Sequence, residues 1–584
     1  MQSTAGHSPT LLHYRWRRLQ TTGPLVGVLV LVASGLAQAD VITSVNGALL
    51  NIVRSTSASL IDGPPEVARE IAMIDGAIFS AVSAANSAPR TISADAAALQ
   101  AAITVMDTLY QAPSSVYQQF KGVTGAQYYG LTSPYRNTLV GPSVKQMNDV
   151  TTQITGLVTE LANLGSGSSV AAGIILGTEA GNAMIASRTN DGSTAANLQT
   201  LTPFVPPNSG QPGVYVPPTG RPAMTPTWGT VTPFGMSAAT LSSLAAKVPA
   251  PPAITSQSYA DQVLQTECAG SGTVLPASIM AVCAANGYHP QTAAEAAAAL
   301  FWNDPGGTFQ PPGHWLQIAD TVAASQNLTL LEHAREDALV GEALADAGIA
   351  VWALKYTYNL WRPVDAIQSD DLSRCDWNPS FTTCDPTWSS LISLPPHPDY
   401  VAGHPGFSGA AATVLANFFE NDNIAFSSTS HAYCNSGVAV TDGNGNTTAC
   451  VLNAITYTSC NNAPAEYGGF AVTDPQYNAS PLICPITESF TSFSQASSGY
   501  LGAEFSRVSG GIHTPIAVEN ATTLGNAIGT VLVPEPPILP VLGTGLLALG
   551  LVKSGWNRFG YKRRIGRSGQ REVASVSWIG TANQ

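Results

Sequence analysis

Three short segments of the sequence hold most of its chemically reactive side chains. The first contains Lys355 and Arg362, seven residues apart in an otherwise apolar stretch. Seven residues are close to two turns of helix, so a helix through them would present both cations on one side. A point charge beside a planar guanidinium suits a phosphate-like oxyanion. Taken alone, the segment fits a pair of surface cations better, because such residues are mostly exposed.

The second segment is the pair Gly403-His404, which precedes a predicted helix over 407–419. Helix N-termini offer free N–H groups and partial positive charge to anions. Glycine lets a backbone approach a ligand closely. His404 would lie beside such an anion, where it could exchange protons near neutral pH. A loop histidine on its own is more often structural, so this segment needs support from the others.

The third segment contains Arg507 and His513, with Gly510-Gly511 between them. The two glycines are expected to break a helix, which lets the chain turn both side chains toward one point. Pro515 suits the first turn of the following helix. A plain helix–turn–helix connection with a surface arginine is the alternative interpretation of this segment.

Together the segments place three cations and two histidines in a fixed order along the chain. This order resembles the signature of the vanadium haloperoxidases and of the type 2 phosphatidic acid phosphatase superfamily. Further segments resemble a bacterial haloperoxidase-related subgroup, namely 228–234, 301–305 and 312–315. The resemblance extends from about residue 64 to about residue 530. It implies an all-α fold of two four-helix bundles with long loops.

The resemblance also implies vanadate as the cofactor and assigns the residues that would hold it. His513 would bind the vanadium directly through a ring nitrogen. The vanadate oxygens would be held by Lys355, Arg362, Arg507 and the backbone N–H of Gly403.

The substrate side follows from the same resemblance. His404 would hydrogen-bond the apical oxygen and act as the acid–base group, while Trp352 and His397 match positions that line the halide side. The reaction would oxidise a halide with hydrogen peroxide to hypohalous acid, which halogenates a small organic substrate. The resemblance further allows a homodimer.

One position departs from the family pattern. The family reads Pro-Ser-Gly-His, whereas this chain has Val401-Ala402-Gly403-His404. The missing serine hydroxyl would have donated to an oxyanion oxygen, and such a bond is worth about 1.5–3 kcal/mol. Ser408 lies a turn further into the predicted helix and is not expected to replace it. We therefore expect an oxyanion site that binds less tightly than usual.

Two other functions stay open. An acid phosphatase on this scaffold would use His513 as the nucleophile, through a phosphohistidine, and His404 as the acid for the leaving group. Phosphate and vanadate share charge and shape, so the sequence separates them poorly. A membrane-embedded lipid phosphatase is disfavoured, since no mature segment is expected to be apolar enough to span a bilayer. The third function is an exported protein that keeps the fold without catalysis, and Ala402 favours it.

The elements that must position these residues read as helices. Helical periodicity runs through 41–201, with clear helices at 68–79 and 170–187. Residues 202–236 are rich in proline and glycine and read as a long loop packed on the core. A long helix over 328–361 carries the first segment, and 427–484 reads as a polar insertion with little regular structure. We expect one helical domain over 40–530, with an N-terminal half 40–236 and a catalytic half 237–530.

Both ends resemble export signals. Residues 1–39 resemble a secretory signal peptide, with a basic start, an apolar run and Ala37-Gln38-Ala39 as the cleavage site. Residues 531–584 contain Val533-Pro534-Glu535-Pro536, an apolar stretch and a basic cluster, an order that resembles a PEP-CTERM sorting signal. This predicts export across the inner membrane, transient anchoring by the C-terminal segment, an exosortase-type partner, and a place in the envelope, on the surface or outside the cell. An uncleaved membrane anchor is the alternative at either end.

Composition narrows the remaining possibilities. A formal net charge of -13 argues against nucleic acid as a partner. Eight cysteines in an exported chain predict up to four disulfides, and we expect neighbours along the chain to pair. The absence of any Cys-x-x-Cys pair argues against a cysteine metal site.

Overall fold

A computed structural model describes residues 40–532 except 369–377, 379, 382, 435–437, 442–446, 453–454, 459–460 and 463–481. The predicted signal peptide lies outside these residues, and so does the predicted sorting segment apart from Val531 and Leu532. The described part is mostly helical, so the prediction of an all-α fold is confirmed in its main feature.

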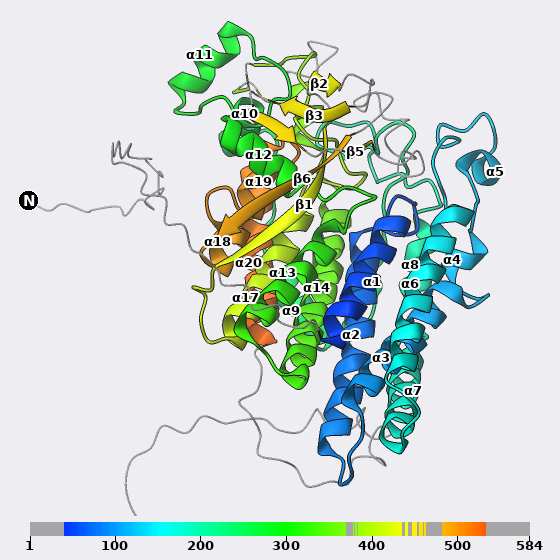
Figure 1. The fold of residues 1–584 in the computed structure, drawn as a ribbon. Helices are drawn as coiled ribbons and strands as arrows, with labels where there is room; N and C mark the ends of the chain where they lie inside the picture. Colours follow the sequence, from blue (N-terminus) through cyan, green and yellow to red (C-terminus); the bar gives the residue numbers. More distant parts are fainter. Residues whose placement is uncertain are drawn as a thin grey trace, which may run out of the picture. The chain divides into compact units, whose positions relative to one another are not determined.

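The N-terminal stretch, for which the sequence predicts helical periodicity, forms helices over most of its length (Figure 1). They are α1 (Val41–Thr56), α2 (Pro64–Ser87), α3 (Ala94–Met106), α4 (Val116–Gln119), α5 (Gly125–Tyr129), α6 (Val144–Asn163), α7 (Ser168–Arg188) and α8 (Ser193–Gln199), with a π-helical turn η1 (Asp107–Gln111) after α3. Asp40, Ser93 and Ser143 accept backbone N–H bonds at the starts of α1, α3 and α6, as N-cap side chains do. The apolar faces of these helices share one core.

Helix α7 lies very close to α3 because its contact face is made of glycines. A Cβ added at Gly173, Gly177 or Gly181 would lie only 2.4–2.7 Å from atoms of α3 or its N-cap. The same helix has 21 residues, and an 18-residue window within it has a mean hydropathy of 1.3, so it is long and apolar enough to cross a membrane by length and composition alone. The prediction that no mature segment is apolar enough to span a bilayer is thus wrong for α7. Its small and aliphatic residues raise its hydropathy, and it has few charged residues to offset them.

The proline-rich stretch 202–236 is irregular, as predicted, apart from the single turn η2 (Trp228–Thr230). Its end is attached to the long helix α14 (Leu330–Tyr358) by one carboxylate. Asp346, which is fully buried, accepts the backbone N–H bonds of Phe234, Gly235 and Met236 at 2.6, 3.1 and 3.1 Å. The stretch is therefore a loop packed on the helices.

Asp346→Ala is expected to lower the free energy of unfolding by about 3 kcal/mol or more. Burial raises the pKa of Asp346 to about 7, so the comparison is made above that pH, where the carboxyl is ionised. Three N–H groups then lose their acceptor at once, and each bond to a charged group contributes about 1.5–3 kcal/mol. Asp346→Asn keeps one acceptor oxygen and should lose less. Urea unfolding of the two variants and the parent protein measures this, and equal stability of Asp346→Ala and the parent would contradict it.

The C-terminal part contains further helices besides α14, which contacts α2 and α17 (Figure 1). They are α9 (Ala238–Ala245), α10 (Gln257–Ala269), α11 (Ala277–Ala285), α12 (Ala293–Phe301), α13 (Gln310–Gln326), α15 (Pro363–Ile367), α17 (Gly403–Phe418), α18 (Phe493–Ser498), α19 (Ala503–Ser509) and α20 (Pro515–Val531). Helix α17 packs along α20, and α14 makes further contacts with α13. The buried apolar residues of this part form a second core.

The segment 427–484 contains strands, so the prediction of little regular structure is wrong. Strands β1 (Phe426–Cys434), β6 (Leu482–Phe490) and β5 (Asn461–Asn462) form one antiparallel sheet. A second antiparallel sheet contains β2 (Val438–Thr441), β3 (Thr447–Leu452) and β4 (Ile455–Thr458). The inward residues of β1 include Ser428 and Ser430, both buried. Small polar residues on both faces weaken the apolar alternation by which strands are predicted.

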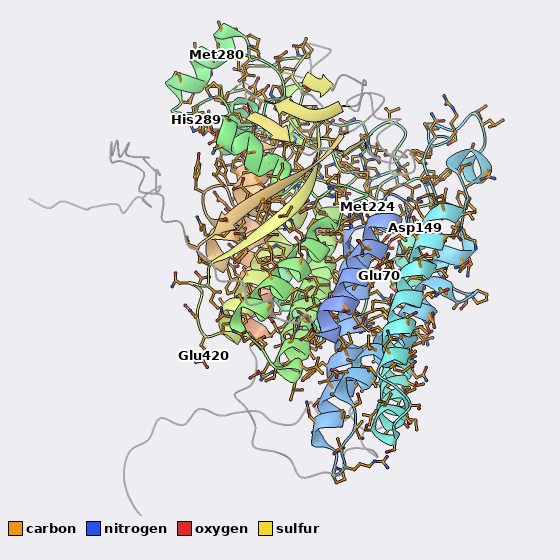
Figure 2. The ribbon with its side chains drawn as sticks, viewed as in Figure 1. Glu70, Asp149, Met224, Met280, His289 and Glu420 are labelled. Carbon is orange, nitrogen blue, oxygen red and sulfur yellow. A yellow bond between two sulfur atoms is a disulfide. The ribbon has the colours of Figure 1, made fainter. Side chains whose placement is uncertain are left out.

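Helix α11 lies at the periphery, where its Met280 is 38% exposed and the following His289 is exposed as well (Figure 2). The disulfide Cys268–Cys283 joins α10 to α11, which confirms the sequential pairing for that pair. Cys384 is also disulfide-bonded. The side chains of the remaining cysteines lie outside the described residues.

Candidate active site

Lys355 and Arg362 converge, but not along one helix as the spacing predicts. Helix α14 ends at Tyr358, where Asn359 takes a left-handed φ of 47°, and Arg362 is the N-cap of α15. Both cations instead reach the loop before α17. Lys355 Nζ donates to the carbonyls of Pro398 and Asp399 at 2.8 and 3.3 Å. Because Lys355 is 0% and Arg362 2% exposed, the interpretation as surface cations is wrong.

Arg362 connects this loop with the third segment. Its Nε donates to the carbonyl of His397 at 2.8 Å, and its Nη2 lies 2.9 Å from Nδ1 of the same residue. Its Nη1 donates to the carbonyl of Ile512 at 2.6 Å and lies 3.1 Å from His513 Nε2. The rings of His397 and His513 stack with centroids 6.5 Å apart. Arg362 therefore holds two histidines from distant segments side by side.

Asp399 orients His513, and it was not predicted from the sequence. Its Oδ1 lies 2.6 Å from His513 Nδ1, and its Oδ2 accepts a bond from Thr514 Oγ1 at 2.8 Å. Burial raises the pKa of Asp399 to about 6, against the opposing charge of Arg362, so the carboxyl is ionised above that pH. An acidic residue four positions before Gly403, in a chain with only 10% charged residues, was the available signal.

The ring of His513 is neutral at neutral pH. Burial lowers its pKa well below the usual value, and the charges of Arg362 and Lys355 lower it further. Since the carboxylate of Asp399 can only accept, the ring proton lies on Nδ1 and the lone pair on Nε2. This is the tautomer that a metal ligand or a nucleophile needs at Nε2.

Two glycines position the turn that carries His513. Gly510 ends α19, as predicted, and Gly511 has a φ of 77°, a conformation that favours glycine. A Cβ at Gly511 would lie 2.2 Å from the carbonyl oxygen of Gly270, which follows α10. Thr266 of α10 also donates to the carbonyl of His513 at 3.2 Å. The turn is thus held against the end of α10.

Helix α17 begins at Gly403, four residues earlier than predicted, so Gly403-His404 forms its first turn. Its N-cap, Ala402, has no side chain able to accept a bond. Ser408 accepts from Trp315 Nε1 at 2.8 Å and is not among the residues that line the pocket described below, which agrees with the expectation that it does not replace the missing serine. A Cβ at Gly403 would meet the ring of Trp352 at an ordinary 3.5 Å, so packing among the described residues does not demand glycine there.

Arg507 and His404 both bond to the chain after α12. Arg507 Nη1 donates to the carbonyl of Trp302 at 2.6 Å, and His404 Nε2 lies 3.2 Å from the carbonyl of Asn303. Arg507 is 0% exposed, yet its Nε and Nη2 have no hydrogen-bond partner among the described residues. Burial lowers the pKa of His404 well below its usual value, and Arg507 adds to the effect. A buried guanidinium with unused donors suits an anion.

A pocket of about 90 Å³ joins these groups. Its lining includes five of the predicted residues: Trp352, His397, Gly403, His404 and Arg507. Three further predicted residues lie next to the pocket without lining it: Lys355, Arg362 and His513. Lys355 bonds to the loop before α17, and Arg362 contacts both His397 and His513. Asn303 and Asp304 also line the pocket, without a role predicted from the sequence. Unused cationic donors, an uncapped helix start and a neutral imidazole together fit a tetrahedral oxyanion.

Asp399→Asn is expected to weaken vanadate binding by about 10- to 100-fold, the usual effect of losing the partner that orients a histidine ligand. An amide can donate to Nδ1 and so favour the tautomer with its proton on Nε2. Equilibrium titration with vanadate measures the change. The matched control is Asp385→Asn, at another buried aspartate that does not line the pocket. Equal vanadate affinities of the two variants would contradict the role of Asp399 in orienting His513.

The C-terminal part of the chain is similar to a known protein family. Residues 337–535 match the family model described as VCPO second helical-bundle domain. This range contains Lys355, Arg362, Gly403, His404, Arg507 and His513.

Two relatives agree with this match. A vanadium chloroperoxidase of Curvularia inaequalis is 28% identical over 162 residues, which cover 22% of this chain and 25% of that protein. The match therefore spans a quarter of the relative's length. A bacterial vanadium-dependent iodoperoxidase has the same fold, with a TM-score of 0.54 at 20% identity over 84% of this chain and 95% of the other. Residues 337–535 are thus similar to the second helical-bundle domain of the VCPO family, and the chain is related to the vanadium haloperoxidases.

Proposed function

We propose that this chain is a vanadate-dependent haloperoxidase, which oxidises a halide with hydrogen peroxide to hypohalous acid. The observation that carries the proposal is Arg507, a fully buried cation with two unused donors. It lines the same pocket as the start of α17 and His404. Desolvating such a charge is unfavourable unless an anion compensates for it. The similarity to the VCPO domain favours vanadate as that anion.

Residues that line the pocket and residues directly behind it would bind the anion together. His513 Nε2 would ligate the vanadium, while Arg362, Arg507, Lys355 and the Gly403 N–H would hold the oxygens. When bound, vanadate supplies a Lewis acid that activates peroxide. Asp399 keeps the proton of His513 on Nδ1, which leaves the lone pair on Nε2, where it accepts from Arg362 Nη1 at 3.1 Å until a ligand replaces that contact.

His404 is placed to move a proton at the pocket. Its Nε2–H donates to the carbonyl of Asn303, which can only accept. Its pKa is low because of burial and Arg507, and negative charge in the pocket would raise it toward the working pH. Trp352 and His397, whose ring centroids lie 5.1 Å apart, would form the halide side.

The same geometry favours one second function, an acid phosphatase. A neutral His513 with Asp399 behind its Nδ1 is also the arrangement of an activated histidine nucleophile. His404 would then donate its proton to the leaving alcohol. A phosphate ester and vanadate would use the same cationic donors.

Activity assays on the mature protein, incubated with vanadate, separate these functions. Bromination or iodination of a phenolic dye with hydrogen peroxide, lost in His513→Ala, is the result expected for the haloperoxidase. Hydrolysis of p-nitrophenyl phosphate that vanadate inhibits would instead support the phosphatase. Failure of both assays together with no binding of vanadate would overturn both functions and leave a non-catalytic surface protein, for which Ala402 is the supporting feature.

We also propose that the chain is exported, with 1–39 as a signal peptide and 531–584 as a sorting segment handled by an exosortase. The disulfide Cys268–Cys283 supports this location, because disulfides persist in oxidising compartments. Mass spectrometry of the protein from its native host tests it. Intact residues 1–39 in the mature protein would contradict the proposal.

A further inference from the structure

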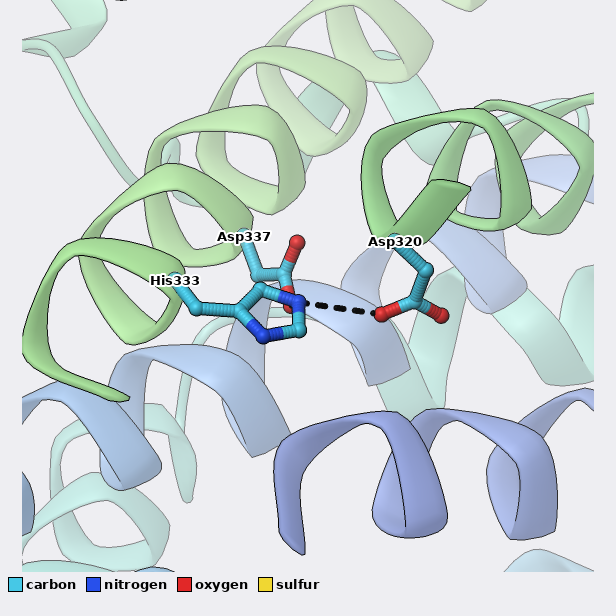
Figure 3. Close-up of side chains that lie close together, drawn as sticks. All are labelled: Asp320, His333 and Asp337. Atoms are coloured by element: carbon cyan, nitrogen blue, oxygen red, sulfur yellow. Dashed lines mark hydrogen bonds and ion pairs between the residues drawn. The ribbon is translucent and has the colours of Figure 1, made fainter. Parts of the chain in front are cut away.

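A second cluster of ionisable side chains lies away from the pocket, where α1, α2, α13 and α14 meet. His333 and Asp337 belong to α14 and Asp320 to α13 (Figure 3). His333 Nε2 lies 3.1 Å from Asp320 Oδ1 and 3.3 Å from Asp337 Oδ2. His333 and Asp337 are buried, whereas the side chain of Asp320 keeps 13% exposure.

Asn46 of α1 is the fourth polar side chain of this cluster. Its Nδ2 lies 2.9 Å from Asp320 Oδ1 and 2.8 Å from Asp337 Oδ2, the same two oxygens that face His333. Its own Oδ1 is buried without a partner among the described residues. Rotation of the amide exchanges the two atoms and would present this oxygen to the cluster. Ligand atoms around a tetrahedral ion such as Zn²⁺ lie about 3.3 Å apart, close to the separations found here.

His333 is already held in the orientation that a metal ligand needs, although the carboxylates around it raise its pKa, so the proton on Nε2 would leave when a metal binds. Its Nδ1 lies 2.8 Å from Asp40 Oδ2 at the start of α1. A carboxylate on one ring nitrogen fixes the proton there and leaves the other nitrogen for the metal. The carboxylate–histidine pair thus directs Nε2 toward Asp320 and Asp337.

Unpartnered carboxylates nearby point to a missing cation. Asp75 of α2 is 1% exposed, and neither of its oxygens has a hydrogen-bond partner among the described residues. The charges that act on it are those of Asp337, Asp320 and His333, so it faces the same cluster. Both oxygens of Glu336 and Oδ1 of Asp337 are equally buried and unpartnered. Burial and the neighbouring carboxylates raise the pKa of Asp75 and Glu336 well above their ordinary values, and a bound cation would offset this unfavourable burial of acidic groups.

We propose that Asp320, His333 and Asp337, with Asn46 as the fourth ligand, bind one divalent transition-metal ion, with Zn²⁺ as the best match. One imidazole and three oxygens suit a borderline ion better than Ca²⁺, which takes six to eight oxygens. Side chains from facing helices form metal sites of this kind in bundle cores. The ion would tie α1, α13 and α14 together, and Asp75 would add compensating charge.

Metal binding by the full mature chain tests the proposal. The purified protein is dialysed against a chelator and titrated with Zn²⁺, and with Mn²⁺ in a parallel experiment, by calorimetry. The titrations use protein with vanadate bound, so that His397, His404 and His513 do not contribute. We expect one equivalent of Zn²⁺ to bind and to raise the melting temperature, and Asp320→Asn to weaken binding at least about 100-fold.

Controls separate this site from general effects of charge and from the pocket. Asp149→Asn changes an aspartate paired with Lys145 on the surface of α6 (Figure 2) and should bind Zn²⁺ as the parent protein does. Asp320→Asn should keep its affinity for vanadate. If this variant does not fold, Asn46→Ala and the melting shift of the parent protein with Zn²⁺ decide. No bound ion in the folded parent protein, or equal binding by Asp320→Asn, would overturn the proposal and leave a protonated His333 among carboxyls.

Discussion

His513→Ala is expected to abolish vanadate binding. The variant removes the one nitrogen placed to ligate vanadium, and with it the contacts to Asp399 at 2.6 Å and Arg362 at 3.1 Å. The loss should exceed the roughly 100-fold change typical for the partners that orient a ligand. The affinity is measured by titrating the protein with vanadate and recording the rise in melting temperature that a bound ligand causes.

The matched control for this variant is His289→Ala. His289 has a 64% exposed side chain in the segment after α11 (Figure 2) and is not part of the pocket lining. It should bind vanadate like the parent protein. Unchanged affinity in His513→Ala, with the fold intact by circular dichroism, would remove the site assignment and both proposed activities with it.

Arg507→Met is expected to weaken vanadate binding by about 100-fold or more while leaving the unliganded protein about as stable as before. Two unused donors, Nε and Nη2, would each make a charge-assisted bond worth about 1.5–3 kcal/mol to the anion. Without a bound anion the buried guanidinium is compensated only in part, by the charge of Asp304, so an apolar side chain of similar size removes an unfavourable charge. The loss of its bond to the carbonyl of Trp302 acts in the opposite direction.

The two halves of this expectation are measured separately. Urea unfolding without vanadate gives the intrinsic stability, and unfolding at saturating vanadate gives the stabilisation by ligand. Arg136→Met, at an exposed arginine, is the control and should change neither. A large loss of stability in the unliganded Arg507→Met protein, with vanadate affinity preserved, would show that Arg507 serves the fold and not the anion.

Local sequence patterns were sufficient for most of the helices. The periodic stretch 41–201, the irregular stretch 202–236 and the break at Gly510-Gly511 appear in the structure as predicted. Each depends on residues three or four apart, or on the backbone freedom of a single residue, which a sequence displays directly. The strands β1 and β6 were missed because their pairing joins residues that are distant in the chain, such as Phe426 and Phe490.

The chemically reactive residues were also found from sequence, because their types and order suffice to suggest an oxyanion. Their convergence was predicted for the wrong reason. Lys355 and Arg362 lie on different helices, and they meet because both bond to the loop 395–399.

By itself, then, the sequence determined which segments are helical and which side chains could hold an anion. Only the tertiary structure decided that Asp399 orients His513, that Arg507 keeps two donors free, and that Asn46 meets Asp320 and Asp337, 274 and 291 residues away. The physical reason is that each of these facts depends on how helices from distant parts of the chain pack and on which polar atoms that packing leaves unsatisfied.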